Sequence, residues 1–149
     1  MSAYADALKL LARRELSEAQ VRQRLARKGH TEPDIDQAVA RLVADRSIDD
    51  ARVADAIART ETAVRKRGRV RVRMRIQQAG IGKDIARQAV DQVFGGIDDD
   101  ELIEAALRKR LRHRDAIADD REFQKLYRYL VAQGFEHDRV LRTLSRKRR

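Results

Sequence analysis

The chain has 149 residues and a formal net charge of +10, with 39% charged and 4% aromatic side chains. It contains no cysteine, which excludes a disulfide framework and a thiol nucleophile. No segment approaches the roughly 18 apolar residues of a membrane-spanning helix, and the N-terminus lacks the pattern of a secretion signal. We therefore expect a cytoplasmic monomer whose excess positive charge favours an anionic partner.

One pattern around a glycine occurs three times along the chain. Each copy has apolar residues eight and four positions before the glycine and a larger residue directly after it. The glycines are Gly29, Gly80 and Gly134, 51 and 54 residues apart. An apolar i, i+4 pair before a glycine is typical of a helix C-terminus. The sequence therefore predicts an all-α fold of three tandem three-helix repeats, forming an elongated, curved array over residues 1–47, 48–96 and 97–149.

Local signals predict the helices of the first repeat. A helix is expected over about residues 3–14, with Leu8 and Leu11 on one face. Ser17 and Gln20 have the spacing of a capping box, in which each side chain accepts a hydrogen bond from the other residue's backbone. The next helix is therefore expected to begin at this pair and to end at the first repeat glycine.

The second repeat has the highest net charge, +5, with eleven basic residues against six acidic ones. Most of that charge lies in one run without a carboxylate. Because an ordinary solvated surface mixes both signs, this run is not typical of one. Because the nearest carboxylates are Glu61 and Asp84, the run contains no internal ion-pair partner. We expect its cations to bind nucleic acid or an acidic protein surface. This basic segment comprises Arg65, Lys66, Arg67, Arg69, Arg71, Arg73 and Arg75.

The conformation of the basic segment has two interpretations. Apolar residues alternate with arginines over residues 69–75, which is the period of a strand. The position of the segment before Gly80 instead predicts a helix, as in the other two repeats. On that helix Val72, Ile76 and Ala79 would face inward. Because the segment has the position of a helix in the repeat pattern, the sequence predicts that it is helical.

The third repeat opens as the second one does. Residues 97–101 repeat the Ile-Asp-Asp pattern of residues 48–50, and carboxylates are stabilising at a helix N-terminus. Asp119 or Asp120 is expected to cap the next helix, which should end at Gly134.

No catalytic constellation is found in the sequence. His30, His113 and His137 are scattered, and His30 takes a position that apolar residues fill in the other repeats, which favours packing at the edge of the core. The aspartates of residues 49–50 and 98–100 are expected to cap helices, not to bind a metal. We therefore expect neither an enzyme nor a bound metal or cofactor.

Two tyrosines of the third repeat lie beside basic residues. Tyr127 and Tyr129 alternate with Arg128 and follow Lys125, so a nucleic-acid base could stack on either ring. Packing at the edge of the core is the favoured interpretation.

Three features occur together: Ile48-Asp49-Asp50, the run 68–73 leading to Ile76 and Gly80-Ile81, and Gly134-Phe135 followed by Val140. Their order and spacing resemble the RecX family of regulators of the RecA recombinase, over nearly the whole chain. The chain departs from that family at Val53, Arg75 and Ala79. Arg75 stands where an acidic residue is frequent, which makes this helix more cationic.

The resemblance implies a fold and a partner. The fold is an array of tandem three-helix repeats. The implied partner is the RecA filament. The charge of the basic segment itself favours single- and double-stranded DNA as further partners, by electrostatics. The implied activity is inhibition of the recombinase and co-protease activities of RecA, within DNA repair, recombination and the SOS response.

Two functions remain open at this point. The first is a regulator that lies along the groove of the RecA–DNA filament, where linked repeats contact repeated subunits. The second is a sequence-specific helix-turn-helix DNA-binding protein, since each repeat ends in helix, glycine turn and helix. The second function requires base-reading residues after each glycine. Residues 32–36 read Glu-Pro-Asp-Ile-Asp, whose negative charge the groove would repel.

The helical interpretation of the basic segment predicts unequal effects of two substitutions. Val72→Asp is expected to lower the free energy of unfolding by about 3 kcal/mol, because it buries a carboxylate without a partner. Val70→Asp is expected to change it little. Equal losses in denaturant unfolding would favour a strand.

Overall fold

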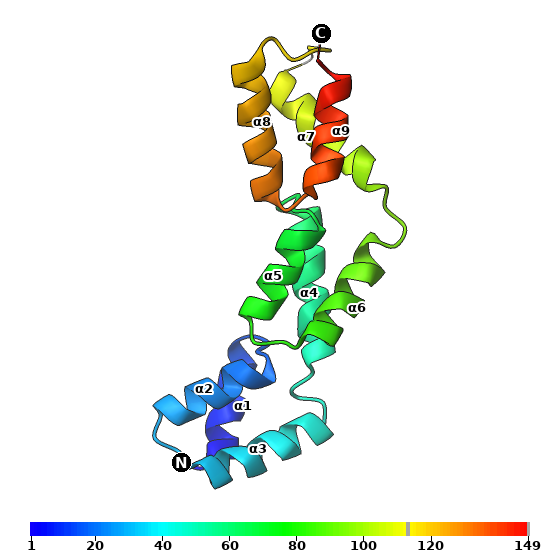
Figure 1. The fold of residues 1–149 in the computed structure, drawn as a ribbon. Coiled ribbons are helices and arrows are strands. Elements are labelled where there is room, and N and C mark those ends of the chain that lie inside the picture. Colours follow the sequence, from blue (N-terminus) through cyan, green and yellow to red (C-terminus); the bar gives the residue numbers. More distant parts are fainter. Residues whose placement is uncertain (113, 149) are drawn as a thin grey trace. The chain divides into compact units, whose positions relative to one another are not determined.

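The computed structural model describes residues 1–112 and 114–148 and contains nine α-helices in that part of the chain (Figure 1). His113 and Arg149 lie outside the described residues. The predicted all-α class is confirmed, and the strand interpretation of the basic segment is wrong, since that segment forms a helix. The helices are α1 (Ala3–Arg13), α2 (Glu18–Arg27), α3 (Glu32–Ala44), α4 (Asp50–Ala63), α5 (Arg69–Gln78), α6 (Lys83–Phe94), α7 (Asp99–Leu111), α8 (Asp120–Gln133) and α9 (His137–Arg146).

The chain divides into two compact units. Unit 1 consists of residues 1–57 and 75–89, and unit 2 of residues 58–74 and 90–149. Helices α4, α5 and α6 each have residues in both units. The boundaries of the three sequence repeats stay a prediction, with three of the described helices in each repeat.

Unit 1 has a core formed where α1, α2 and α3 pack against one another. Val21 and Leu25 of α2 are fully buried there. The face of α1 differs from the expected one, because Leu8 is 40% exposed while Ala3 and Ala7 are buried. Small side chains therefore take the central positions of α1, and the larger leucines lie beside them.

The buried face of α5 is the predicted one. Val72, Ile76 and Ala79 are all buried, while Met74 is 52% exposed. Val70 is half-buried. The apolar positions four and eight before Gly80 therefore mark the inward face, as the repeat pattern indicates.

In unit 2 the start of α5 meets the end of α8. The Gly68 N–H donates a hydrogen bond of 2.8 Å to the Gln133 carbonyl, and the Val70 N–H donates one of 3.1 Å to the Gly134 carbonyl. The first N–H groups and last carbonyls of helices have no partners within their own helices. This α5–α8 joint pairs the N–H groups at the start of α5 with the carbonyls at the end of α8. It thereby brings the positive end of the α5 dipole to the negative end of the α8 dipole.

Two glycines allow the α5–α8 joint to close. A Cβ on Gly68 would lie 2.6 Å from the backbone of Gly134. Gly134 has φ +103°, and a Cβ there would lie 2.3 Å from the Cβ of Arg71. A side chain at either position would therefore force the two helix ends apart.

A related joint in unit 1 connects the end of α5 with the start of α2. The buried Ser17 hydroxyl donates a 2.5 Å hydrogen bond to the Ala79 carbonyl and accepts one from the Gln20 N–H, within the predicted capping box. Asp50 accepts a 2.8 Å hydrogen bond from the Glu18 N–H. Of the first N–H groups of α2, Glu18 thus has its acceptor in Asp50, and Gln20 has its acceptor in the N-cap residue Ser17.

Unit 2 has its core between α7, α8 and α9. Ile103, Leu130 and Leu144 are fully buried in it. Asp98 and Asp119 cap α7 and α8 through their side chains, as the sequence predicts for these helix starts. None of the described helices is long and apolar enough to cross a membrane.

The glycines of unit 1 give a prediction for stability. Gly29 and Gly80 both have positive φ, but a Cβ meets nothing within 4 Å at Gly29 and lies 2.5 Å from the Cβ of Ala19 at Gly80. Gly29→Ala is expected to lower the free energy of unfolding by about 1 kcal/mol through backbone strain alone. Gly80→Ala should lower it by about 1–3 kcal/mol more, through overpacking.

A double-mutant cycle with Ala19→Gly checks the cause. Removing the Ala19 Cβ should recover most of the additional loss in Gly80→Ala and none of the loss in Gly29→Ala. Additive effects of Gly80→Ala and Ala19→Gly would show that the close approach is absent in solution.

Candidate functional site

The basic segment begins in the turn between α4 and α5. Lys66 has φ +58°, in the left-handed region, and its neighbour Arg67 donates its backbone N–H to the Glu61 carbonyl at 2.9 Å. This turn leaves the Arg65 and Lys66 side chains exposed.

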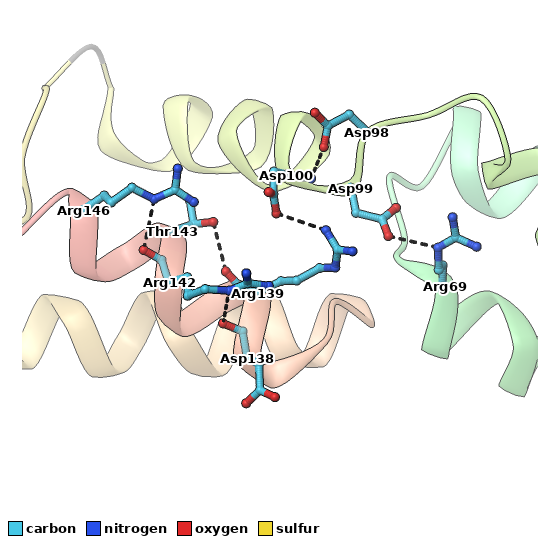
Figure 2. A network of polar contacts seen from close by, with 9 residues as sticks. All are labelled: Arg69, Asp98, Asp99, Asp100, Asp138, Arg139, Arg142, Thr143 and Arg146. Atoms are coloured by element: carbon cyan, nitrogen blue, oxygen red, sulfur yellow. Dashed lines mark hydrogen bonds and ion pairs between the residues drawn. The ribbon is translucent and has the colours of Figure 1, made fainter.

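Arg69 contacts several residues outside the segment, and Figure 2 shows its bond to Asp99. Its Nε donates to Asp99 at the start of α7 at 2.9 Å, and its guanidinium also lies 3.8 Å from Asp91. It donates to the Phe94 carbonyl at 3.2 Å and lies 4.9 Å from the centre of the Phe94 ring. Because the Asp99 side chain is only 12% exposed, Arg69 neutralises a largely buried carboxylate and connects three helices.

Arg67 and Arg71 bind the C-terminus of α8. Arg67 Nη1 donates to the Gln133 side-chain oxygen at 2.8 Å, and Arg71 Nη1 donates to the Ala132 carbonyl at 2.7 Å. Cations are stabilising at this end of a helix, where the last carbonyls lack partners. The two arginines therefore strengthen the α5–α8 joint.

The expectation that the segment lacks carboxylate partners is wrong for part of it. Arg65 and Arg67 lie 3.7 Å and 3.9 Å from the carboxylate of Glu61, whose side chain is 7% exposed. Arg69 meets Asp91 and Asp99, which are distant in the sequence. The Glu61–Arg65 pair has the local i,i+4 spacing, whereas no local pattern indicates the contacts of Asp91 and Asp99 with Arg69.

Lys66 and Arg73 remain available. Both are exposed, and within residues 1–112 and 114–148 neither forms an ion pair or a side-chain hydrogen bond. Arg75 is also exposed but belongs to unit 1, where it borders an open hollow of about 200 Å³ with Val53 and Ile57. The structure thus places six of the seven basic residues in unit 2.

The remaining candidates of the sequence have structural contacts. The Tyr127 hydroxyl lies 2.5 Å from Nδ1 of His137, and the Arg110 guanidinium lies 3.7 Å from the centre of the Tyr129 ring. His30 lies 2.7 Å from Asp6, and this hydrogen bond lowers the pKa of the Asp6 carboxyl. These contacts favour packing at the edge of the core for all three side chains.

Of the aspartates expected to cap α4 and α7, Asp49 and Asp98 do so, whereas Asp50, Asp99 and Asp100 bond to other helices. Asp49 accepts from the Arg52 N–H at 3.1 Å, and Asp98 accepts from the Asp100 N–H at 2.9 Å. Among the described residues, no group of three or more His, Cys, Asp or Glu side chains has the arrangement of a metal site.

The helices that follow the repeat glycines are α3, α6 and α9. Their first turns carry acidic residues: Glu32 and Asp34 in α3, Asp84 in α6 and Asp138 in α9. Carboxylates in these first turns oppose entry into a DNA groove, so the geometry disfavours base reading by these helices.

Comparison with known proteins agrees with this helical arrangement. Residues 3–42 match the family model for the first three-helix domain of RecX, and residues 98–144 match the model for the third. The regulatory protein RecX of Chlorobaculum tepidum is 31% identical over 144 residues, which is 97% of this chain and 87% of the relative. The chain belongs to the RecX family. The regulatory protein RecX of Syntrophotalea carbinolica is also 31% identical, over 98% of this chain and 96% of the relative.

Solved RecX structures share the fold. The crystal structure of RecX from Lactobacillus salivarius matches with a TM-score of 0.78 at 20% identity, covering 97% of this chain and 93% of that one. A second RecX crystal structure matches with a TM-score of 0.75 at 22% identity, covering 97% and 70%. The all-α repeat fold is thus the RecX fold.

The contacts of the basic segment predict opposite outcomes for two of its arginines. Arg69→Gln is expected to lower the free energy of unfolding by about 2 kcal/mol, because Asp99 loses a charged hydrogen-bond partner in a largely buried place. Arg73→Gln is the matched control in the same helix and should change it by less than about 0.5 kcal/mol. Thermal or denaturant unfolding measures both. Equal effects would disagree with the described contacts.

Proposed function

We propose that this RecX-family chain is a non-enzymatic regulator that binds the RecA–DNA filament along its groove and inhibits the recombinase and co-protease activities of RecA. Membership of a family of regulatory proteins supports the proposal. The single observation that carries the binding role is the pair of exposed cations without partners in the described chain, Lys66 and Arg73.

The available cations suit a phosphate backbone. Lys66 and Arg73 are hydrated in the free protein, so a phosphate contact replaces water and releases counterions from the nucleic acid. Arg71 can contribute as well, because its bond to Ala132 uses one of five guanidinium N–H donors. Arg69 instead has a structural role, since its charge is already paired with Asp99.

The repeat architecture suits a filament. A filament presents identical subunits at regular intervals, and a chain of related three-helix units can contact several of them at once. Linked contacts that are individually weak gain affinity through the high effective concentration of the second contact after the first. Occupation of the groove by such a chain would block access of the second DNA and of co-protease substrates.

The variant Lys66→Gln with Arg73→Gln tests the site. It is expected to raise the concentration needed for half-inhibition of RecA strand exchange by about tenfold, since each lost phosphate contact weakens binding severalfold near 0.1 M salt. Its unfolding temperature should not change. The matched control is Lys9→Gln with Arg13→Gln, which removes equal charge from exposed positions of α1. Full inhibition by the folded Lys66/Arg73 variant would refute the assignment.

A second measurement separates filament binding from DNA binding. Affinity is compared for naked single-stranded DNA and for the same DNA coated with RecA, at several salt concentrations. Tighter binding to the coated DNA supports the regulator. Tighter binding to one duplex sequence than to all others would support the helix-turn-helix alternative instead.

A further inference from the structure

Helix α8 carries a row of cations on the face opposite its core. Arg121, Lys125 and Arg128 are four and three residues apart, so they share one face of the helix. All three are exposed, whereas Leu126 and Leu130 are buried on the other face. Within the described part of the chain, none of the three cations forms an ion pair or a side-chain hydrogen bond. We call these residues the α8 row.

The acidic residues of α8 have their main partners outside the row. Asp120 forms an ion pair with Arg148. Glu122 accepts two hydrogen bonds from Arg114, at 3.0 Å and 2.7 Å, and these lower the pKa of its carboxyl. Glu122 also accepts from the Ala118 N–H. Arg114 is therefore the main partner of Glu122, and Lys125 makes a smaller electrostatic contribution to the lowered pKa of Glu122. The row keeps most of its positive charge.

The α8 row continues into the basic segment. Ala132 lies four residues after Arg128, on the same face of α8, and its carbonyl accepts the hydrogen bond from Arg71. From Arg121 to Ala132 the helix rises by roughly 16 Å, at about 1.5 Å per residue. Arg71 thus extends the row at the C-terminus of α8, so that four cations follow one another at intervals of about one helical turn.

The flanks of the row favour phosphate contact without base stacking. Arg110 covers the Tyr129 ring at 3.7 Å, and the Tyr127 hydroxyl is bonded to His137. Single-stranded DNA is usually bound by exposed aromatic rings together with cations, and these rings are engaged. The phosphates of duplex DNA form a dense line of negative charge, and a row of cations roughly 16 Å long can contact more than one of them.

We propose that the α8 row is a second nucleic-acid contact, which binds the sugar–phosphate backbone of duplex DNA in continuity with Arg71. This inference deepens the proposed function and rests on it, because it assigns duplex backbone as a ligand of the third repeat. Binding is through charge and hydrogen bonds to phosphate oxygens, and it is independent of base sequence.

The test measures binding of a fluorescent 30-base-pair duplex by the full chain from 50 to 200 mM salt. The variant Arg121→Gln, Lys125→Gln, Arg128→Gln is expected to bind at least tenfold more weakly at 100 mM salt. The slope of log affinity against log salt should fall by about 2 to 3, since each phosphate contact contributes about 0.9. The matched control, Lys9→Gln, Arg13→Gln, Arg24→Gln, removes the same charge from exposed positions of unit 1. It should change the affinity by less than threefold.

The outcomes separate this inference from the proposed function. If the wild-type chain binds neither duplex DNA nor RecA-coated DNA, both fail. If the wild type inhibits RecA and the α8 variant, folded by circular dichroism, binds the duplex as the wild type does, only the α8 assignment fails. Equal losses in the α8 variant and its control would show dependence on net charge alone and would also overturn it. A loss confined to single-stranded DNA would overturn the choice of duplex.

Discussion

The structure of unit 2 depends on the hydrogen bonds that α5 and α8 exchange at their ends. A helix begins with N–H groups and ends with carbonyls that it cannot pair internally. The N–H groups of Gly68 and Val70 find their acceptors in the carbonyls of Gln133 and Gly134. The backbones approach so closely that neither glycine can carry a side chain. A glycine that looks like a simple helix stop in the sequence is thus also a contact surface.

The α5–α8 joint determines which cations of the basic segment remain free. The end of α8 attracts Arg67 and Arg71, and the start of α7 pairs Asp99 with Arg69. Those charges stabilise the fold, whereas Lys66 and Arg73 stay in solvent. A segment that is uniformly basic in sequence is therefore divided into structural and available residues, and the proposed binding role belongs mainly to the second group.

The sequence predicted the parts of this structure that depend on local periodicity and spacing. Gly80 with its apolar partners predicted the buried face of α5, and Ser17 predicted the start of α2. The Arg69–Asp99 pair could not be predicted, because its partners are 30 residues apart and no local pattern links them. The α8 row was visible as basic residues at helical spacing. In the sequence, the neighbouring Asp120 and Glu122 offset its charge. Only the structure shows that Arg148 and Arg114 pair with these two acids.

Native-state amide hydrogen exchange tests the α5–α8 joint most directly. If the joint forms in solution, the Gly68 N–H exchanges only when unit 2 opens, with protection similar to that of the Leu130 N–H in the core of α8. The Val70 N–H should behave in the same way. Exchange of the Gly68 N–H at the rate of an unstructured chain, while the Leu130 N–H stays protected, would contradict the account.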